Sequence, residues 1–455
     1  MEGCLSGKLA LAVCLLFLAA PGFGTAQTGL PEIPASVPAQ TTTASQISPG
    51  AAYQEAMRPV ELTRSSITNW SEIEQASLAV AIKRAADACA ARSANSYVGE
   101  PLIDLARLCS LGQNWPAVIL ATDRHIHEDT QPKPRLAEAY STQIDAQLHL
   151  KDEQAAFKSV QAMLADVPYS SLVANASTEA INYMQLLFTA DAVSLAVTRQ
   201  PRVLDLLRAA SMPGVPASGT VTAPSTVELY RQALTLAELQ QLEAKSGEAS
   251  QTIAALNAVV PADLPEDDRL AIETLRERYE QIGKPLAPIA LLSALDRSLH
   301  HLPNIPAHLT ITALLLFPDW CAQCVRLARQ IPETVFTVQG QAAYIYGLLA
   351  QTVPPEKIPL STVRTAATQQ ASFNPAYAAD YLKGTPTLTV PSALLNTFHA
   401  TDVPLLVLTD SHGIVRLIEV VDETALQPGD TVDSAVALVG HRWPTTILTG
   451  PALPH

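Results

Sequence analysis

Two long regions of the chain differ in the pattern of their apolar and polar residues. Between residues 51 and 286, Ala, Leu, Glu, Gln and Arg dominate and runs of β-branched residues are scarce, as is typical of helices. Clusters of Pro and Gly separate the helical stretches, and the clearest cluster is Met212–Ser225. The pattern therefore predicts an all-α region over residues 51–286.

The C-terminal region, residues 287–455, is strand-like instead. A stretch punctuated by prolines, Pro285–Pro306, leads to Leu309–Phe317, a continuous apolar run of the kind found in central strands covered on both faces. Three further runs have the character of strands: Ala342–Leu349, Leu405–Thr409 and Ile414–Val421. The turn sequence Asp410–Gly413 suits an antiparallel hairpin between the last two, and Thr431–Val439 predicts a closing helix. We expect a mixed α/β domain here.

Length and composition agree with a multidomain protein. The chain has 455 residues, more than one ordinary core accommodates, and 48% of them are apolar. The formal net charge is −14. An acidic surface repels phosphate backbones, so the charge argues against a nucleic-acid partner.

The N-terminus has the pattern of an export signal. Lys8 precedes the apolar run Leu9–Ala20, and small residues follow up to Ala26. The run is shorter than the roughly 20 residues that span a bilayer, and no later segment is long and apolar enough to do so. We expect a signal peptide over residues 1–26 and a periplasmic or secreted protein, with an uncleaved anchor as the alternative. Residues 27–50, rich in Pro, Thr, Ser, Gln and Ala, are expected to form a flexible linker.

Two stretches of the helical region share one spacing. Apolar residues and a final proline recur at offsets of zero, four, seven and twelve, in one set formed by Ala156, Val160, Met163 and Pro168 and another formed by Ala249, Ile253, Leu256 and Pro261. This resembles the second helix of a tetratricopeptide-type repeat, and Tyr140 falls at the aromatic position of the first helix. The resemblance implies an array of helical hairpins, and an unrelated helical bundle is the alternative.

Cysteines give the candidate chemistry. Apart from Cys4 and Cys14 in the signal region, the chain contains two pairs. Cys89 and Cys109 lie on separate predicted helices, and a structural disulfide between them is the leading interpretation in an oxidising compartment. Free buried cysteines and a second redox site are the alternatives.

Cys321 and Cys324 stand between the apolar strand and a predicted helix, Val325–Ile331. Unpaired N–H groups and the helix dipole at this position stabilise a thiolate, which is the attacking species, and a second Cys three residues later can resolve a mixed disulfide. A structural disulfide without redox turnover is the alternative. Zinc binding is disfavoured because the chain contains no second CxxC. We expect no metal and no cofactor.

The segment Phe317-Pro-Asp-Trp-Cys-Ala-Gln-Cys324 resembles the thioredoxin superfamily, and especially the exported TlpA/ResA-type thiol–disulfide oxidoreductases. The resemblance implies that Cys321 is the nucleophile and that Cys324 is the resolving thiol. Trp320, beside the pair, is expected to shield it and to contact the substrate, and a purely structural place in the core is the alternative. Phe398 and Pro404 reproduce the family's spacing between an aromatic residue and a cis-proline. The resemblance further implies that Pro404 faces the disulfide and that Val403 offers its backbone to a substrate segment.

Two positions depart from the family's pattern. Leu315 stands where thioredoxins have a buried acid, and Ala322-Gln323 replaces Gly-Pro between the cysteines. Pro386 is a rival for the cis position, although the strand–turn–strand sequence that follows Pro404 favours the latter. The direction of electron transfer stays open.

These observations predict an exported thiol–disulfide oxidoreductase whose partners are protein thiols or disulfides and a further redox protein. In this interpretation the helical region docks partner proteins. The alternative is a helical interaction scaffold that carries a structural, non-catalytic thioredoxin-like domain.

Overall fold

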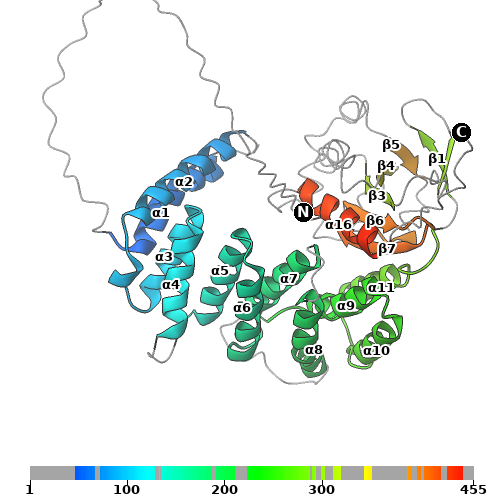
Figure 1. Ribbon diagram of the computed structural model, residues 1–455, viewed down its shortest axis with the longest axis horizontal. Coiled ribbons are helices and arrows are strands. Elements are labelled where there is room, and N and C mark those ends of the chain that lie inside the picture. Colours follow the sequence, from blue (N-terminus) through cyan, green and yellow to red (C-terminus); the bar gives the residue numbers. More distant parts are fainter. Residues whose placement is uncertain are drawn as a thin grey trace, which may run out of the picture. The chain divides into compact units, whose positions relative to one another are not determined.

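The computed structural model describes residues 47–66, 72–128, 133, 135–186, 191–210, 223–286, 289–293, 299–302, 311–318, 343–350, 387–390, 397–400, 404–421 and 428–443 (Figure 1). These residues belong to one compact unit, which spans residues 47–455. The predicted signal peptide, nearly all of the predicted linker and the predicted helix Val325–Ile331 lie outside the described residues.

The described N-terminal part is helical, as its composition predicts. A short 3-10 helix covers Ala94–Ser96. The α-helices are α1 Pro49–Ser66, α2 Glu72–Ala90, α3 Glu100–Leu111, α4 Trp115–His127, α5 Leu136–His149, α6 Glu153–Asp166, α7 Ser171–Leu186, α8 Asp191–Ala210, α9 Thr226–Leu242, α10 Ser246–Asn257 and α11 Glu266–Tyr279. Helices that follow one another in the chain pack together as hairpins, among them α3 with α4, α5 with α6 and α9 with α10.

Three of these hairpins share one turn geometry. Gln113, Lys151 and Ala244, each in the middle of its turn, have φ values of 58 to 59°. The N–H of each donates to the carbonyl three residues earlier at 2.9 Å. The next N–H donates to the carbonyl five residues before it, at 2.8 to 2.9 Å, so the carbonyls at the helix end are satisfied. A non-glycine residue in this conformation costs roughly 1–2 kcal/mol. The packing of the paired helices therefore stabilises a turn conformation that these residues disfavour on their own.

The apolar residues of the recurring spacing lie in the second helices of two hairpins, α6 and α10, and the two prolines follow the ends of these helices. Ala156, Val160 and Met163 of α6 are fully buried, as are Ala249 and Leu256 of α10. Tyr140 of α5 is also buried, and its hydroxyl donates to Asp166 Oδ2 at 2.9 Å. Each second helix thus packs its small and apolar residues against its partner helix, as the spacing predicts.

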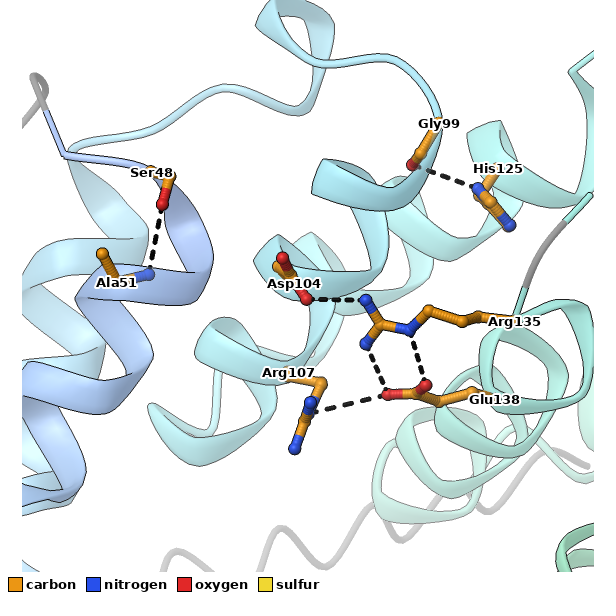
Figure 2. Close-up of polar contacts among 8 residues, drawn as sticks. All are labelled: Ser48, Ala51, Gly99, Asp104, Arg107, His125, Arg135 and Glu138. Carbon is orange, nitrogen blue, oxygen red and sulfur yellow. Dashed lines mark hydrogen bonds and ion pairs between the residues drawn. The ribbon is translucent and has the colours of Figure 1, made fainter. Parts of the chain in front are cut away.

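The first helix begins slightly before the predicted linker ends. Pro49 occupies the first helical position, and the hydroxyl of Ser48 accepts a hydrogen bond from Ala51 N at 3.2 Å (Figure 2). A serine cap followed by proline is a strong start signal for a helix. Residues 49 and 50 therefore belong to α1 and not to the linker.

An ion network joins α3 to the start of α5 (Figure 2). The guanidinium of Arg135 contacts Glu138 at 2.8 Å and Asp104 of α3 at 2.7 Å. Arg107 lies 3.6 Å from Glu138 on the other side. Arg135 is an N-terminal cap with φ of 59°, so the carboxylates on both sides fix a residue whose backbone conformation is otherwise unfavourable.

Strands form the C-terminal part, together with the closing helix α16 Pro428–Arg442. The strands are β1 Ile289–Ser293, β2 Leu299–Leu302, β3 Ile311–Pro318, β4 Ala343–Ala350, β5 Thr387–Val390, β6 Leu405–Thr409 and β7 Val415–Val420. They form one mixed sheet in the order β2-β1-β5-β4-β3-β6-β7. β4 runs parallel to β3 and to β5, whereas β6 is antiparallel to β3 and to β7. The four predicted strands and the closing helix match β3, β4, β6, β7 and α16 within a few residues.

Three strands were not predicted. β1 and β2 form a hairpin inside the stretch punctuated by prolines, and β1 pairs with the short strand β5. These strands have only four or five residues each, so they are too short to show a clear period in the sequence. Pairing with the neighbouring strands defines them.

The sheet and the helices share one apolar core. Every residue from Ile311 to Phe317 is at most 1% exposed, so both faces of β3 are covered. One cluster of buried side chains contains Leu315 and Leu406 of the sheet, Leu438 of α16 and Met184 of α7. The helical region therefore packs directly against the strands.

Candidate functional site

The carboxyl end of β3 and the start of β6 lie at the same edge of the sheet. Leu316 of β3 pairs with Leu405 of β6, so the antiparallel register brings Phe317 next to Pro404. Pro404 is buried, and its carbonyl accepts a hydrogen bond from Val421 N at 3.0 Å. Cys321 follows the last residue of β3, Pro318, by three positions. The sheet topology therefore brings the strand end that precedes the predicted CxxC segment and the predicted substrate-facing proline to one edge.

Most of the predicted site lies outside the described residues. This applies to Trp320, Cys321, Cys324 and Val403, and to the rival proline Pro386. The redox roles assigned to these residues stay predictions. Pro404 is described, but the peptide bond before it involves Val403.

The Cys89–Cys109 disulfide that the sequence favours is present. It links α2 to α3 with a Cα–Cα distance of 5.1 Å, and both cysteines are at most 2% exposed. A buried bond between two packed helices acts as a structural link, because no exposed sulfur is available for exchange.

The segment before Pro404 is held by α11. Phe398 is 1% exposed, and Arg278 of α11 donates to its carbonyl from Nε at 3.3 Å. A second guanidinium nitrogen of Arg278 donates to the carbonyl of His399 at 2.6 Å. Neighbouring Glu277 contacts the imidazole of His399 at 3.0 Å. The last turn of α11 therefore fixes the backbone at Phe398 and His399, a few residues before β6.

The hairpin turn after β6 is organised by one buried carboxylate. Asp410 is 1% exposed, and its Oδ1 accepts hydrogen bonds from the N–H groups of His412 and Ile414 at 2.8 and 3.0 Å. Its Oδ2 lies 2.7 Å from the guanidinium of Arg416, which in turn stacks 4.5 Å over the ring of Trp443. The predicted turn over residues 410–413 is present, and the charge pair with Arg416 explains why an acid begins it.

Two further carboxylates meet where α9 packs on β7. Burial and the charge of Glu419 raise the pKa of Glu238 to about 7, and burial raises the pKa of Glu419 to about 7. Arg278 and Arg231 oppose this shift at Glu238. Leu315, Leu406 and Glu419 are aligned across three strands and share one face of the sheet. Leu315, at the position where thioredoxins have a buried acid, is fully buried. The nearest acid in this row is Glu419, two strands away.

Sequence reasoning missed Arg278, Glu238 and Glu419. The one local signal is a charged residue in an otherwise apolar pattern, as at Glu419 in the strand sequence Val-Arg-Leu-Ile-Glu-Val. Which element such a residue faces depends on contacts between residues far apart in the chain, and no local pattern contains that information.

Within the described ranges, no cluster of three or more His, Cys, Asp or Glu side chains is arranged to hold a metal ion. No described helix combines the length and the apolar character that a bilayer span requires. Comparison of the chain with models of protein families, with curated proteins and with solved structures finds no match.

Proposed function

We propose that this protein is an exported thiol–disulfide oxidoreductase with a C-terminal thioredoxin-like domain, in which Cys321 and Cys324 exchange disulfides with partner proteins. The observation that supports this most strongly is the central part of the sheet. β4, β3, β6 and β7 are neighbours in that order, the first two parallel and the last two an antiparallel hairpin, and α16 follows. A parallel pair followed by an antiparallel hairpin and a helix is the core arrangement of the thioredoxin fold, and the WCxxC motif stands directly after its first strand.

The position of the motif supports the same proposal. The carboxyl end of β3 lies beside Pro404, so the backbone that leads to Cys321 starts next to the proline that the resemblance assigns to substrate contact. Leu309–Phe317 predicts a strand buried on both faces, and β3 has that burial. A motif at the end of a rigid, buried strand is held in place better than one on a free loop.

The proposed reaction is a balanced exchange. The thiolate of Cys321 attacks one sulfur of a substrate disulfide, forms a mixed disulfide and releases the other substrate sulfur as a thiolate, which takes up a proton. Cys324 then loses its proton and attacks the sulfur of Cys321. The Cys321–Cys324 disulfide forms, and the second substrate thiolate leaves. The substrate gains two electrons and the pair loses two; the reverse sequence oxidises a substrate dithiol. A second redox protein restores the pair.

The buried Cys89–Cys109 disulfide supports export, since such bonds persist in oxidising compartments. The helical hairpins are proposed to dock partner proteins, because stacked hairpins offer extended surfaces. A non-catalytic scaffold is the second candidate. The common core of helices and strands favours it, because a sheet that packs on the helices can serve to stabilise them.

A trapping experiment tests the proposal. The reduced Cys324→Ser variant is mixed with a fluorescent peptide that carries a glutathione mixed disulfide. We expect a stable adduct on Cys321, because the resolving thiol is missing, and a short-lived one on the wild-type protein. The matched Cys321→Ser variant, which also retains one cysteine of the motif, should form the adduct far more slowly. Equal, slow labelling of both variants would favour the scaffold.

A further inference from the structure

The last turn of α11 contacts the segment that precedes Pro404, although the two are far apart in the chain. Arg278 is only 7% exposed, and its guanidinium donates to the carbonyls of Phe398 and His399 at 3.3 and 2.6 Å. The residues joined are 120 and 121 positions apart. Both acceptors are main-chain atoms, so the contact fixes the course of the backbone and does not depend on the side chains of the segment.

His399 gives the segment a sharp turn that needs such support. Its φ is 45°, which is uncommon for a residue other than glycine. Its imidazole contacts Glu277 at 3.0 Å, next to Arg278. Two consecutive residues of α11 thus hold a turn that lies a few residues before β6.

The chain after α11 holds the other end of the same hairpin (Figure 1). Gly283 N donates to Val415 O at 2.8 Å, and Val415 N donates to Lys284 O at 2.9 Å. Leu286 N donates to Gly413 O at 2.8 Å. One short stretch of chain, residues 277–286, therefore contacts the segment before β6 and the turn after it.

We propose that Arg278 is a positioning residue for substrate exchange: it fixes the Phe398–His399 backbone ahead of Pro404, which the β3–β6 register places beside the end of β3, and it makes the helical region part of the site. The proposal rests on the proposed function. Arg278 touches neither the cysteines nor a substrate in this account. It acts through its hydrogen bonds to the carbonyls of Phe398 and His399.

The guanidinium suits this task better than another cation would. Its planar fork donates to two neighbouring carbonyls in one fixed geometry, whereas the ammonium of lysine is a point charge on a mobile chain. A lysine at this position keeps the charge and loses the fork. Substitution by methionine keeps most of the volume and removes every donor.

The test compares two reactions of the full-length reduced protein. One is alkylation of Cys321 by iodoacetamide, a small probe that needs no docking surface. The other is exchange with a glutathionylated peptide, which needs the backbone beside Pro404. For Arg278→Met we expect peptide exchange to slow on the order of tenfold or more, because a small misplacement of a docking group is enough for such a loss. Alkylation should keep its wild-type rate and pH profile.

Arg202→Met is the matched control. Arg202 also donates to two main-chain carbonyls, those of Val167 and Ala165 at 2.9 and 3.3 Å, but entirely within the helical region. We expect it to leave the ratio of the two rates unchanged. If Arg278→Met does not fold, as judged by thermal unfolding, Arg278→Lys decides, and we expect a smaller change of that ratio in the same direction.

The outcomes separate the two proposals. If the wild-type protein reacts slowly with both probes, the proposed function fails. If the wild-type protein exchanges rapidly, the proposed function stands. The positioning role is then wrong if the Arg278 variants keep the wild-type ratio of the peptide-exchange rate to the alkylation rate, which includes the case in which both rates fall by the same factor.

Discussion

Arg199 is a fully buried arginine at the junction of three helices. Its guanidinium donates to Thr178 Oγ1 of α7 at 2.8 Å and to the carbonyl of Gln232 in α9 at 2.9 Å. Its Nε has no hydrogen-bond partner within the described part of the chain, and burial lowers the pKa of the side chain. A third guanidinium contact reaches Ser177 Oγ at 3.5 Å, so the volume of the side chain and three neutral acceptors account for the contribution of Arg199 to stability.

We therefore expect Arg199→Ala to lower the free energy of unfolding by about 3 kcal/mol or more, because it leaves a cavity and removes the donor from Ser177, Thr178 and Gln232. Arg199→Met fills most of the cavity and should lose roughly half as much. Urea unfolding followed by circular dichroism measures both. Arg208→Ala is the control, since Arg208 is half-exposed on α8 and pairs with Asp205 at the surface; its effect should stay within about 0.5 kcal/mol. Equal losses for Met and Ala would mean that hydrogen bonding, and not volume, dominates.

At the scale of elements, the contact of α9 with β7 contains two carboxyl groups with strongly raised pKa values. Glu238 and Glu419 both have a pKa raised to about 7, the first by burial and by the charge of Glu419, the second by burial. A raised carboxyl pKa means that the folded protein binds protons more tightly than the unfolded chain. Stability from this pair is therefore full at about pH 4 and declines as the pH rises to about 7.

The pH dependence can be tested with neutral replacements. We expect Glu238→Gln and Glu419→Gln each to flatten the decline of unfolding free energy between about pH 4.5 and 7. The charges of Arg278 and Arg231 act in the opposite direction and limit the rise in the pKa of Glu238. Glu61→Gln, on an exposed position of α1, should leave the slope as it is in the wild-type protein. An unchanged slope in both interface variants would show that these carboxyls do not titrate together at this contact.

How well sequence patterns predicted the elements depended on their length and burial. The apolar run before Pro318 and the hairpin around Asp410 were predictable, because burial on both faces and turn chemistry leave strong local signals. β1, β2 and β5 were not, since their pairing partners define them. The left-handed turn residues Gln113, Lys151 and Ala244 left no signal either, because none of them is a glycine or asparagine.

Among the candidate-site residues, too, only those that belong to a local sequence pattern leave a signal in the sequence. Local spacing singles out Cys321, Cys324 and Pro404 as candidates, and their roles stay predictions. Local spacing could not single out Arg278, because its hydrogen bond to Phe398 spans 120 residues. The sequence also placed the domain boundary at residues 286 and 287, whereas pairing with the β7 hairpin begins at Gly283.

At the scale of the whole molecule, the helical region and the sheet are not joined by a tether alone. One apolar cluster contains side chains of both, and Glu243 at the end of α9 lies 3.7 Å from Arg442 of α16. A fragment that starts at residue 287 would lack Arg278 and the strand-like residues 283–286. Partner selection by the helical region is therefore best studied in the full-length protein.

The central claim is that Cys321 and Cys324 form a redox-active pair, and its reduction potential tests this most directly. The full-length protein is equilibrated in glutathione buffers, quenched with acid and alkylated, and the peptide with both cysteines is quantified by mass spectrometry. We predict a single two-electron transition between about −120 and −270 mV, the range of redox-active domains, while the buried Cys89–Cys109 bond stays oxidised. A pair that stays oxidised below about −300 mV, as structural disulfides do, or that never forms a bond, would contradict the account.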